Sequence, residues 1–426
     1  GFIAGALEET YTGETHDKHA RTSRIDRFIT SKIWGLPIFL FLMWLMFQAT
    51  FTLGGIPAEW LENGVSWLGD FVQNHMGEGS LRDLLVDGVI GGVGGVIVFL
   101  PNILILFFFI SLMEDTGYMA RAAFIMDRLM HKMGLHGKSF IPLLMGFGCN
   151  VPAIMATRML ESHKDRILTM LIMPFMSCSA RLPVYILLIS AFFPSYQGLV
   201  LFSIYLVGIL LAVISSLIFK RLFFRQAEAP FVMELPPYRI PTGRSVVRHM
   251  WHKGSQYLRK MGTIILLASV LIWALGHYPQ GDDSMTPAQQ QEQSYIGRMG
   301  KVIEPVIRPL GFDWQIGISL VTGLAAKEIV VSTMAVLTDS GEEDTNLVGN
   351  LQNLTYTQGE RVGEKVYTPL VAYTLMIFIL LYFPCIAAIT AIRREAGRGW
   401  AVFTLFYTTG VAWLVSFAIF QIGSLF

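Results

Sequence analysis

Residues 118–157 read YMARAAFIMDRLMHKMGLHGKSFIPLLMGFGCNVPAIMAT, and residues 295–334 read YIGRMGKVIEPVIRPLGFDWQIGISLVTGLAAKEIVVSTM. The two stretches align without a gap at an offset of 177 residues. The aligned pairs include Tyr118 and Tyr295, Arg121 and Arg298, Asp127 and Glu304, Gly134 and Gly311, and Gly146 and Gly323. A second offset of 207 residues aligns Cys178 with Cys385. The difference between the two offsets matches the length of the polar insert at 339–367. The pattern indicates an internal repeat.

Hydropathy places this repeat in a membrane. The chain is 53 % hydrophobic and 15 % charged, whereas soluble domains carry about 25 % charged residues. Long neutral runs predict seven spans, which are 33–53, 89–114, 167–193, 196–219, 261–278, 368–392 and 400–425. A net charge of +1 argues against a nucleic-acid partner. We therefore expect an all-α polytopic membrane protein.

Basic residues give the expected orientation. With seven spans, the loops rich in Lys and Arg fall on one side, which predicts a cytoplasmic N-terminus and an outer C-terminus. The basic residues near 298–308 are the exception, because they fall on the outer side.

The spans divide the chain into expected units. These are a tail (1–32), a first span (33–53), an outer amphipathic segment (54–82), a first gate repeat (83–222), a basic cytoplasmic linker (223–260) and a second gate repeat (261–426) with its outer insert at 339–367. Each repeat is expected to contain a non-spanning hairpin, at 118–157 and 295–334, together with three full crossings. An odd number of crossings inverts the second copy, and inverted repeats with broken helices are typical of transporters.

The chain has three cysteines, and each lies beside Gly or Pro in an apolar stretch: Cys149, Cys178 and Cys385. At membrane depth, a helix break is tolerated where it lines a cavity or packs against protein. A thiol at such a break can hold a transition metal. The alternative is that each Cys is a small apolar packing residue.

Other polar residues in apolar runs are weaker candidates. Asp115 could line a cation path and Met119 could offer a thioether ligand, with a solvated helix end and packing as the respective alternatives. Glu328 could also take part in the path, or it could form a purely structural pair with Lys327. Lys327 could pair with Glu328 or act as a gate, and Asn150 could offer an oxygen or cap a helix. For Arg181, a structural pairing with backbone carbonyls or an acid is the alternative to a role in the path.

Four motifs resemble the ferrous iron transport protein B (FeoB) family. They are Gly117-Tyr-Met-Ala-Arg121, Gly146-Phe-Gly-Cys-Asn-Val-Pro-Ala-Ile154, Ser177-Cys-Ser-Ala-Arg-Leu-Pro183 and Gly323-Leu-Ala-Ala-Lys-Glu328. The similarity runs over essentially the whole chain. It implies Fe2+ uptake across the bacterial cytoplasmic (inner) membrane through paired gate regions. It also implies metal contacts at Cys149, Cys178 and Cys385, although Ala326 stands where a fourth thiol would complete the symmetry.

The resemblance further implies a GTP-binding domain that this chain does not carry. Family members have that domain before the first span, so we expect GTP and Mg2+ to bind there and this chain to be no enzyme. Small cytoplasmic proteins of the same transport system are possible partners. Two other functions stay open: a nucleoside or organic-ion carrier of the same fold, and a membrane sensor or assembly subunit without transport.

Overall fold

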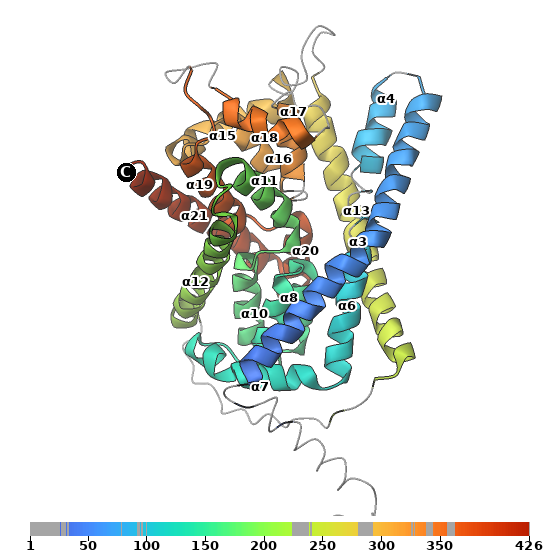
Figure 1. Cartoon of the computed structure of the whole chain (residues 1–426), viewed down its shortest axis with the longest axis vertical. Coiled ribbons are helices and arrows are strands. Elements are labelled where there is room, and N and C mark those ends of the chain that lie inside the picture. Colours follow the sequence, from blue (N-terminus) through green and yellow to red (C-terminus); the bar gives the residue numbers. More distant parts are fainter. Residues whose placement is uncertain are drawn as a thin grey trace, which may run out of the picture.

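A computed structural model describes residues 26, 31, 34–77, 79–91, 94, 97–98, 100–223, 238, 241–279, 293–324, 327, 329–337, 344–355 and 363–425. All regular elements in these residues are helices, apart from one isolated bridge between Thr355 and Lys365. The expected all-α class is therefore confirmed. Figure 1 shows long helices that run along the molecule and shorter ones packed between them.

Five helical stretches are long and apolar enough to cross a membrane. They are α3 (Gly35–His75), the pair α10–α11 (163–192), α12 (Gln197–Phe223), the pair α19–α20 (369–396) and α21 (Arg398–Gly423). A sixth results if α6 (Leu100–Asp115) and α7 (Tyr118–Lys132), which meet at 84°, count as one span. The expected span 261–278 falls in α13 (Gly243–His277), where many side chains lie outside the described residues. The protein is thus a polytopic membrane protein with five to six spans among the described residues.

The helix that contains the first expected span is longer than that span. Helix α3 runs without interruption for 41 residues and contains Pro57, so residues 56–75, which lie in the expected outer amphipathic segment, continue the same helix. The short helix α4 (Ser80–Asp83) and the π-helix η1 (Leu84–Gly91) follow it. Glycine and proline at 54–57 weaken a helix but do not end it here, because tertiary context overrides such local preferences.

The first half of the molecule is built from short helices joined by breaks. After α7 come η2 (Gly137–Ser139), α8 (Phe140–Gly146), α9 (Asn150–Ala156), η3 (Thr157–Met159), α10 (His163–Ile172), η4 (Met173–Phe175), η5 (Ser179–Arg181) and α11 (Leu182–Phe192). Helix α12 closes this half. In Figure 1, α7 lies across the lower end of the molecule.

The second half follows a similar order after α13. Its elements are α15 (Tyr295–Ile307), η6 (Arg308–Leu310), α16 (Trp314–Thr322), α17 (Ile329–Leu337), α18 (Asp344–Asn353), α19 (Pro369–Leu381), α20 (Ile386–Ala396) and α21. Gly134 and Gly311 occupy matching turns, with φ of +78° and +79°. In both turns the following N–H donates to the carbonyl five positions back, at 2.9 Å and 3.4 Å. In Figure 1, α15 and α16 lie at the end opposite α7.

Burial separates the helices into core and periphery. In α19 nearly every residue is buried, as expected of a helix that is apolar all round. By contrast, α12 and α21 bury only 28 % and 22 % of their most apolar windows, so most of their apolar surface is left to face lipid. The core therefore lies around α19, which packs against α11, α12 and α21.

Candidate functional site at the helix breaks

All three cysteines lie at the start of a helix that follows a break. Cys149 precedes α9, Cys178 precedes η5 and Cys385 precedes α20, and each has an extended backbone with ψ between 126° and 160°. Each side chain is half-buried, and none of the three forms a disulfide. Helix starts leave backbone N–H groups without intrahelical partners, so each thiol stands beside polar backbone.

The breaks contact one another in pairs. In the first half, the N–H and hydroxyl of Ser179 donate to the carbonyl of Gly148, at 3.1 Å and 2.9 Å. In the second half, the N–H of Ile386 donates to the carbonyl of Leu324, at 3.1 Å. In the first half, the hydrogen bond joins the break between α8 and α9 to the break between α10 and α11. In the second half, it joins the end of α16 to the start of α20. The contact in the first half brings Cys149 near Cys178.

Two glycines allow this close approach. A Cβ at Gly146 would lie 2.8 Å from Met173 Sδ and 3.1 Å from Met176 Cβ. A Cβ at Gly323 would lie 2.6 Å from the Tyr382 hydroxyl. A side chain at either position would force its neighbours to shift, the flexible methionines at Gly146 and the tyrosine at Gly323. Close packing therefore favours glycine at both aligned positions.

A buried cation stabilises each break. Arg181 is 1 % exposed and donates to the carbonyls of Pro174 (3.2 Å) and Met176 (3.3 Å). Lys327 is 3 % exposed, donates to the carbonyl of Phe383 at 2.8 Å and lies 3.4 Å from the centre of the Tyr382 ring. Positions 176 and 383 match at the second offset of 207 residues. The backbone carbonyls of Met176 and Phe383 thus occupy equivalent positions, and one accepts a hydrogen bond from an arginine and the other from a lysine.

Buried oxygens lie beside the breaks of the first half. Asn150 Oδ1, directly after Cys149, has no hydrogen-bond partner among the described residues. The hydroxyls of Tyr185 and Tyr205 both lie within hydrogen-bonding reach of the Ser177 hydroxyl. Buried polar atoms usually have partners, so oxygens of this kind are candidates for contact with water or an ion.

Tyrosines connect the two halves of the site. Tyr382 is fully buried within electrostatic range of Arg181, Tyr185 and Cys385. Sequence reasoning missed Tyr185 and Tyr382, although a polar residue inside an apolar run is a sufficient signal for attention.

Two candidates, Asp115 and Met119, lie with Arg121 at the corner between α6 and α7. Asp115 ends α6 and is half-buried, whereas Met119 and Arg121 are buried in the first turn of α7. The Arg121 guanidinium binds both carboxylate oxygens of Asp26, at 2.9 Å and 3.2 Å, and donates to the carbonyl of Gly117 at 2.9 Å. It also lies 4.0 Å from the Tyr238 ring. These contacts give Arg121 a structural role at this corner.

A pre-formed metal centre is not seen among the described residues. No three His, Cys, Asp or Glu side chains within them are placed to hold a metal ion together. Glu328, the carboxylate expected beside Lys327, lies outside the described residues.

Comparisons with known proteins agree with this architecture. The family described as "Gate: Nucleoside recognition" matches residues 96–192 and 258–399. The family described as "Ferrous iron transport protein B C terminus" matches residues 201–253. No solved structure matches the chain.

Several curated relatives match the whole chain or nearly all of it. A "Fe(2+) transport protein A/Fe(2+) transporter FeoB fusion protein" of Porphyromonas gingivalis is 55 % identical, covering 100 % of this chain and 54 % of that protein. The Fe(2+) transporter FeoB of Campylobacter jejuni is 45 % identical, covering 95 % of this chain and 66 % of the relative. The Staphylococcus aureus Fe(2+) transporter FeoB is 44 % identical, covering 100 % and 62 %. The chain thus spans between half and two thirds of the length of these relatives, and it belongs to the ferrous iron transport protein B family, of which it carries the membrane region.

Proposed function

We propose that this chain is the permease core through which Fe2+ crosses the bacterial cytoplasmic membrane. The observation that carries the proposal is the pair of facing breaks at Gly148 and Ser179, with Cys149 and the unpartnered Asn150 Oδ1 beside them. Thiolate and neutral oxygen ligands both suit Fe2+. The names of the relatives, which are called Fe(2+) transporters, support the same substrate.

An inverted repeat would give the ion two gates. The matching turns at Gly134 and Gly311, the shared order of elements and the opposite positions of α7 and α15 in Figure 1 support this arrangement. With α13 as a seventh span, the N-terminus lies in the cytoplasm and the C-terminus outside. The gates are then 83–222 and 261–426, joined by the linker 223–260. Transport alternates between them around a site near mid-membrane.

The buried cations limit how Fe2+ passes. Arg181 and Lys327 stand at the breaks and repel a bare divalent ion, so anionic thiolates or a carboxylate are needed along the path. We assign this role to Cys149, Cys178 and Cys385, with Asn150 as an oxygen ligand and Glu328, Asp115 and Met119 as further contacts. Few ligands at each site keep binding weak enough for release.

Regulation would come from outside this chain. The relatives extend well beyond the matched region, and we place a GTP-binding domain with its Mg2+ there, so that this chain itself is no enzyme. The relative named as a fusion with Fe(2+) transport protein A supports a small partner protein of that kind.

A second function is a nucleoside carrier. The observation in its favour is the match to a family described as nucleoside recognition, which covers more than half of the chain. Under this function the buried Ser, Asn and Tyr oxygens contact the substrate, and the thiols have no part in transport.

Anaerobic 55Fe2+ uptake into proteoliposomes tests both functions. The parent chain, with and without its full-length N-terminal region, is compared with Cys149→Ser, Cys178→Ser, Cys385→Ser and Asn150→Ala. Ser190→Ala on the exposed face of α11 is the control. We expect uptake to fall at least tenfold in a folded Cys149 variant and to stay unchanged in the control. Unchanged uptake in all four variants refutes the proposed ligands, and nucleoside uptake without Fe2+ uptake supports the second function.

A further inference from the structure

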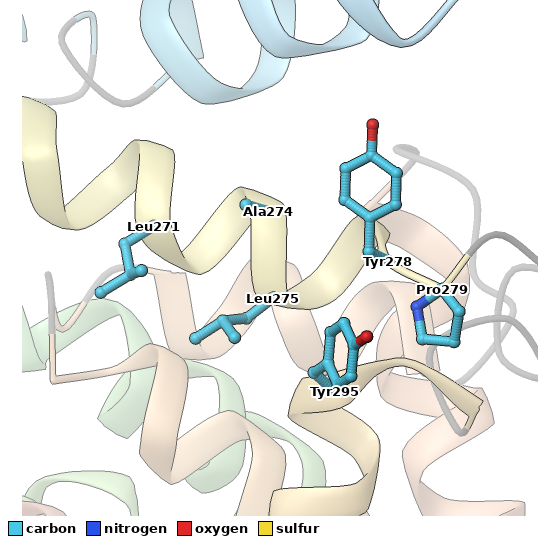
Figure 2. A pocket seen from close by; sticks show the side chains of 6 residues that line it. All are labelled: Leu271, Ala274, Leu275, Tyr278, Pro279 and Tyr295. Carbon is cyan, nitrogen blue, oxygen red and sulfur yellow. The ribbon is translucent and has the colours of Figure 1, made fainter.

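An apolar groove separates the C-terminal part of α13 from α15. One section, of about 490 Å³, is lined by Leu271, Ala274, Leu275, Tyr278, Pro279 and Tyr295. Figure 2 shows Leu275 and Tyr295 side by side in this section, with the Tyr278 ring turned away from them. A second section, of about 420 Å³, continues along α15 past Met299, Val302 and Ile303 to Arg298. The groove is therefore apolar along its length and has a guanidinium at its rim.

The outer face of α15 is also apolar. Tyr295, Met299, Val302 and Val306 recur at helical spacing, and each is between 42 % and 76 % exposed. The opposite face, with Ile296, Gly300 and Ile307, is buried. A helix that buries one face in protein and leaves a second apolar stripe exposed is suited to contact with acyl chains.

Cations line one flank of this stripe. Arg298 and Lys301 in α15 and Arg308 just after it are all exposed. Within the described residues, no ion pair involves Arg298, whose guanidinium lies 5.8 Å from the Tyr295 ring. Lys301 lies 5.8 Å from the Trp314 ring. Long basic side chains beside an apolar stripe reach the level of lipid phosphates while their stems stay in apolar contact.

The position of α15 places this face at a membrane boundary. Its repeat partner α7 meets the preceding helix α6 at 84°, so it lies across one end of the bundle, and α15 lies at the other end (Figure 1). Arg298, Lys301 and Arg308 are also the basic residues that fall on the expected outer side, against the tendency of Lys and Arg to lie in cytoplasmic loops. A bound anion would explain why they lie there.

We propose that the groove between α13 and α15 binds one anionic phospholipid. Its acyl chain lies along Leu275, Tyr295 and Val302, and its phosphate contacts Arg298 and Lys301. The site is separate from the helix breaks, so it does not depend on which substrate the core carries. Apolar contact supplies the affinity, and the two cations supply the preference for an anionic headgroup.

Native mass spectrometry of the detergent-solubilised chain, titrated with dioleoyl phosphatidylglycerol or dioleoyl phosphatidylcholine, tests the site. We expect tighter binding of the first phosphatidylglycerol than of phosphatidylcholine. The double variant R298Q/K301Q should raise the Kd for phosphatidylglycerol by roughly ten- to thirtyfold, since each cation near a lipid surface contributes about 1 kcal/mol. R393Q/R394Q, which removes the same charge from an exposed pair at the end of α20, should leave this Kd unchanged.

The apolar half of the site is tested separately. Leu275→Trp fills the groove without changing charge, and it should weaken both lipids to a similar extent. Equal Kd values for the parent chain and R298Q/K301Q would overturn the proposal. So would a change of oligomeric state in Leu275→Trp, measured by light scattering, with lipid binding unchanged, because the groove would then be an interface between two copies.

Discussion

Replacing Gly134 and Gly311, two of the glycines with a left-handed backbone, by alanine should destabilise the protein to different extents. Gly134 and Gly311 have the same φ, +78° and +79°, so each alanine carries a backbone cost of about 1–2 kcal/mol. At Gly311 the new Cβ would also lie 2.4 Å and 2.6 Å from two ring atoms of Phe420. At Gly134 the nearest atom, at 2.2 Å, belongs to the flexible chain of Lys220, which can move aside.

The surroundings therefore set the difference between the two sites. A rigid ring that has to shift adds about 1–3 kcal/mol of overpacking, whereas a mobile lysine chain adds little. We expect Gly134→Ala to lower the free energy of unfolding by about 1–2 kcal/mol, and Gly311→Ala by about 2–5 kcal/mol. Asparagine tolerates this backbone region better than alanine, so Gly134→Asn should cost less than Gly134→Ala.

SDS titration in mixed micelles, followed by tryptophan fluorescence, measures these free energies. Gly410→Ala is the control, because Gly410 lies inside α21 with open space at its Cβ position, and alanine favours a helix. The control should be neutral or stabilising. A cost at Gly134 equal to or above the cost at Gly311 would refute the assignment of the difference to Phe420.

Three further predictions concern charged groups. Burial raises the pKa of Asp313, which caps α16, to about 6; the folded state then holds the proton more tightly than the unfolded state, so stability should fall by about 3 kcal/mol as pH rises from about 4 to about 6. Asp313→Asn keeps the cap and should abolish this step in SDS titrations at several pH values; an unchanged step would contradict the assignment. Arg121→Gln and Asp26→Asn should show a coupling of about 2 kcal/mol in a double-mutant cycle, and additive effects would exclude their ion pair. Glu395→Gln should cost about 3 kcal/mol, because the 3 % exposed carboxylate pairs with two arginines of the first half; a loss below 1 kcal/mol would contradict this.

The breaks could be predicted from sequence because they depend on local residue types. Each cysteine beside Gly or Pro lies at a break, and one glycine pair at an offset of 177 residues, Gly134 and Gly311, occupies matching turns. For Arg181, pairing with backbone carbonyls was one of two alternatives, and the structure shows that pairing.

Other features could not be predicted because they depend on distant parts of the chain. Lys327 contacts the carbonyl of Phe383, 56 residues away, a partner that sequence reasoning did not name. Arg121 pairs with Asp26, 95 residues away. Nothing in a linear pattern identifies such partners. The length of α3 escaped prediction for another reason: Gly54, Gly55 and Pro57 signal a helix end that packing overrides.

The length of α3 has a consequence for membranes of different thickness. Its 41 residues extend roughly 60 Å at 1.5 Å per residue, about twice the hydrocarbon depth of a typical bilayer. Helix α12, with 27 residues, extends only about 40 Å. Because α3 is longer than any bilayer is thick, it still spans the hydrocarbon layer when the bilayer becomes thicker or thinner. The shorter, lipid-facing helices α12 and α21 have to change their tilt instead. Host lipid composition should therefore act on this protein mainly through these two helices, which pack against the α10–α11 and α19–α20 pairs that carry Cys178 and Cys385.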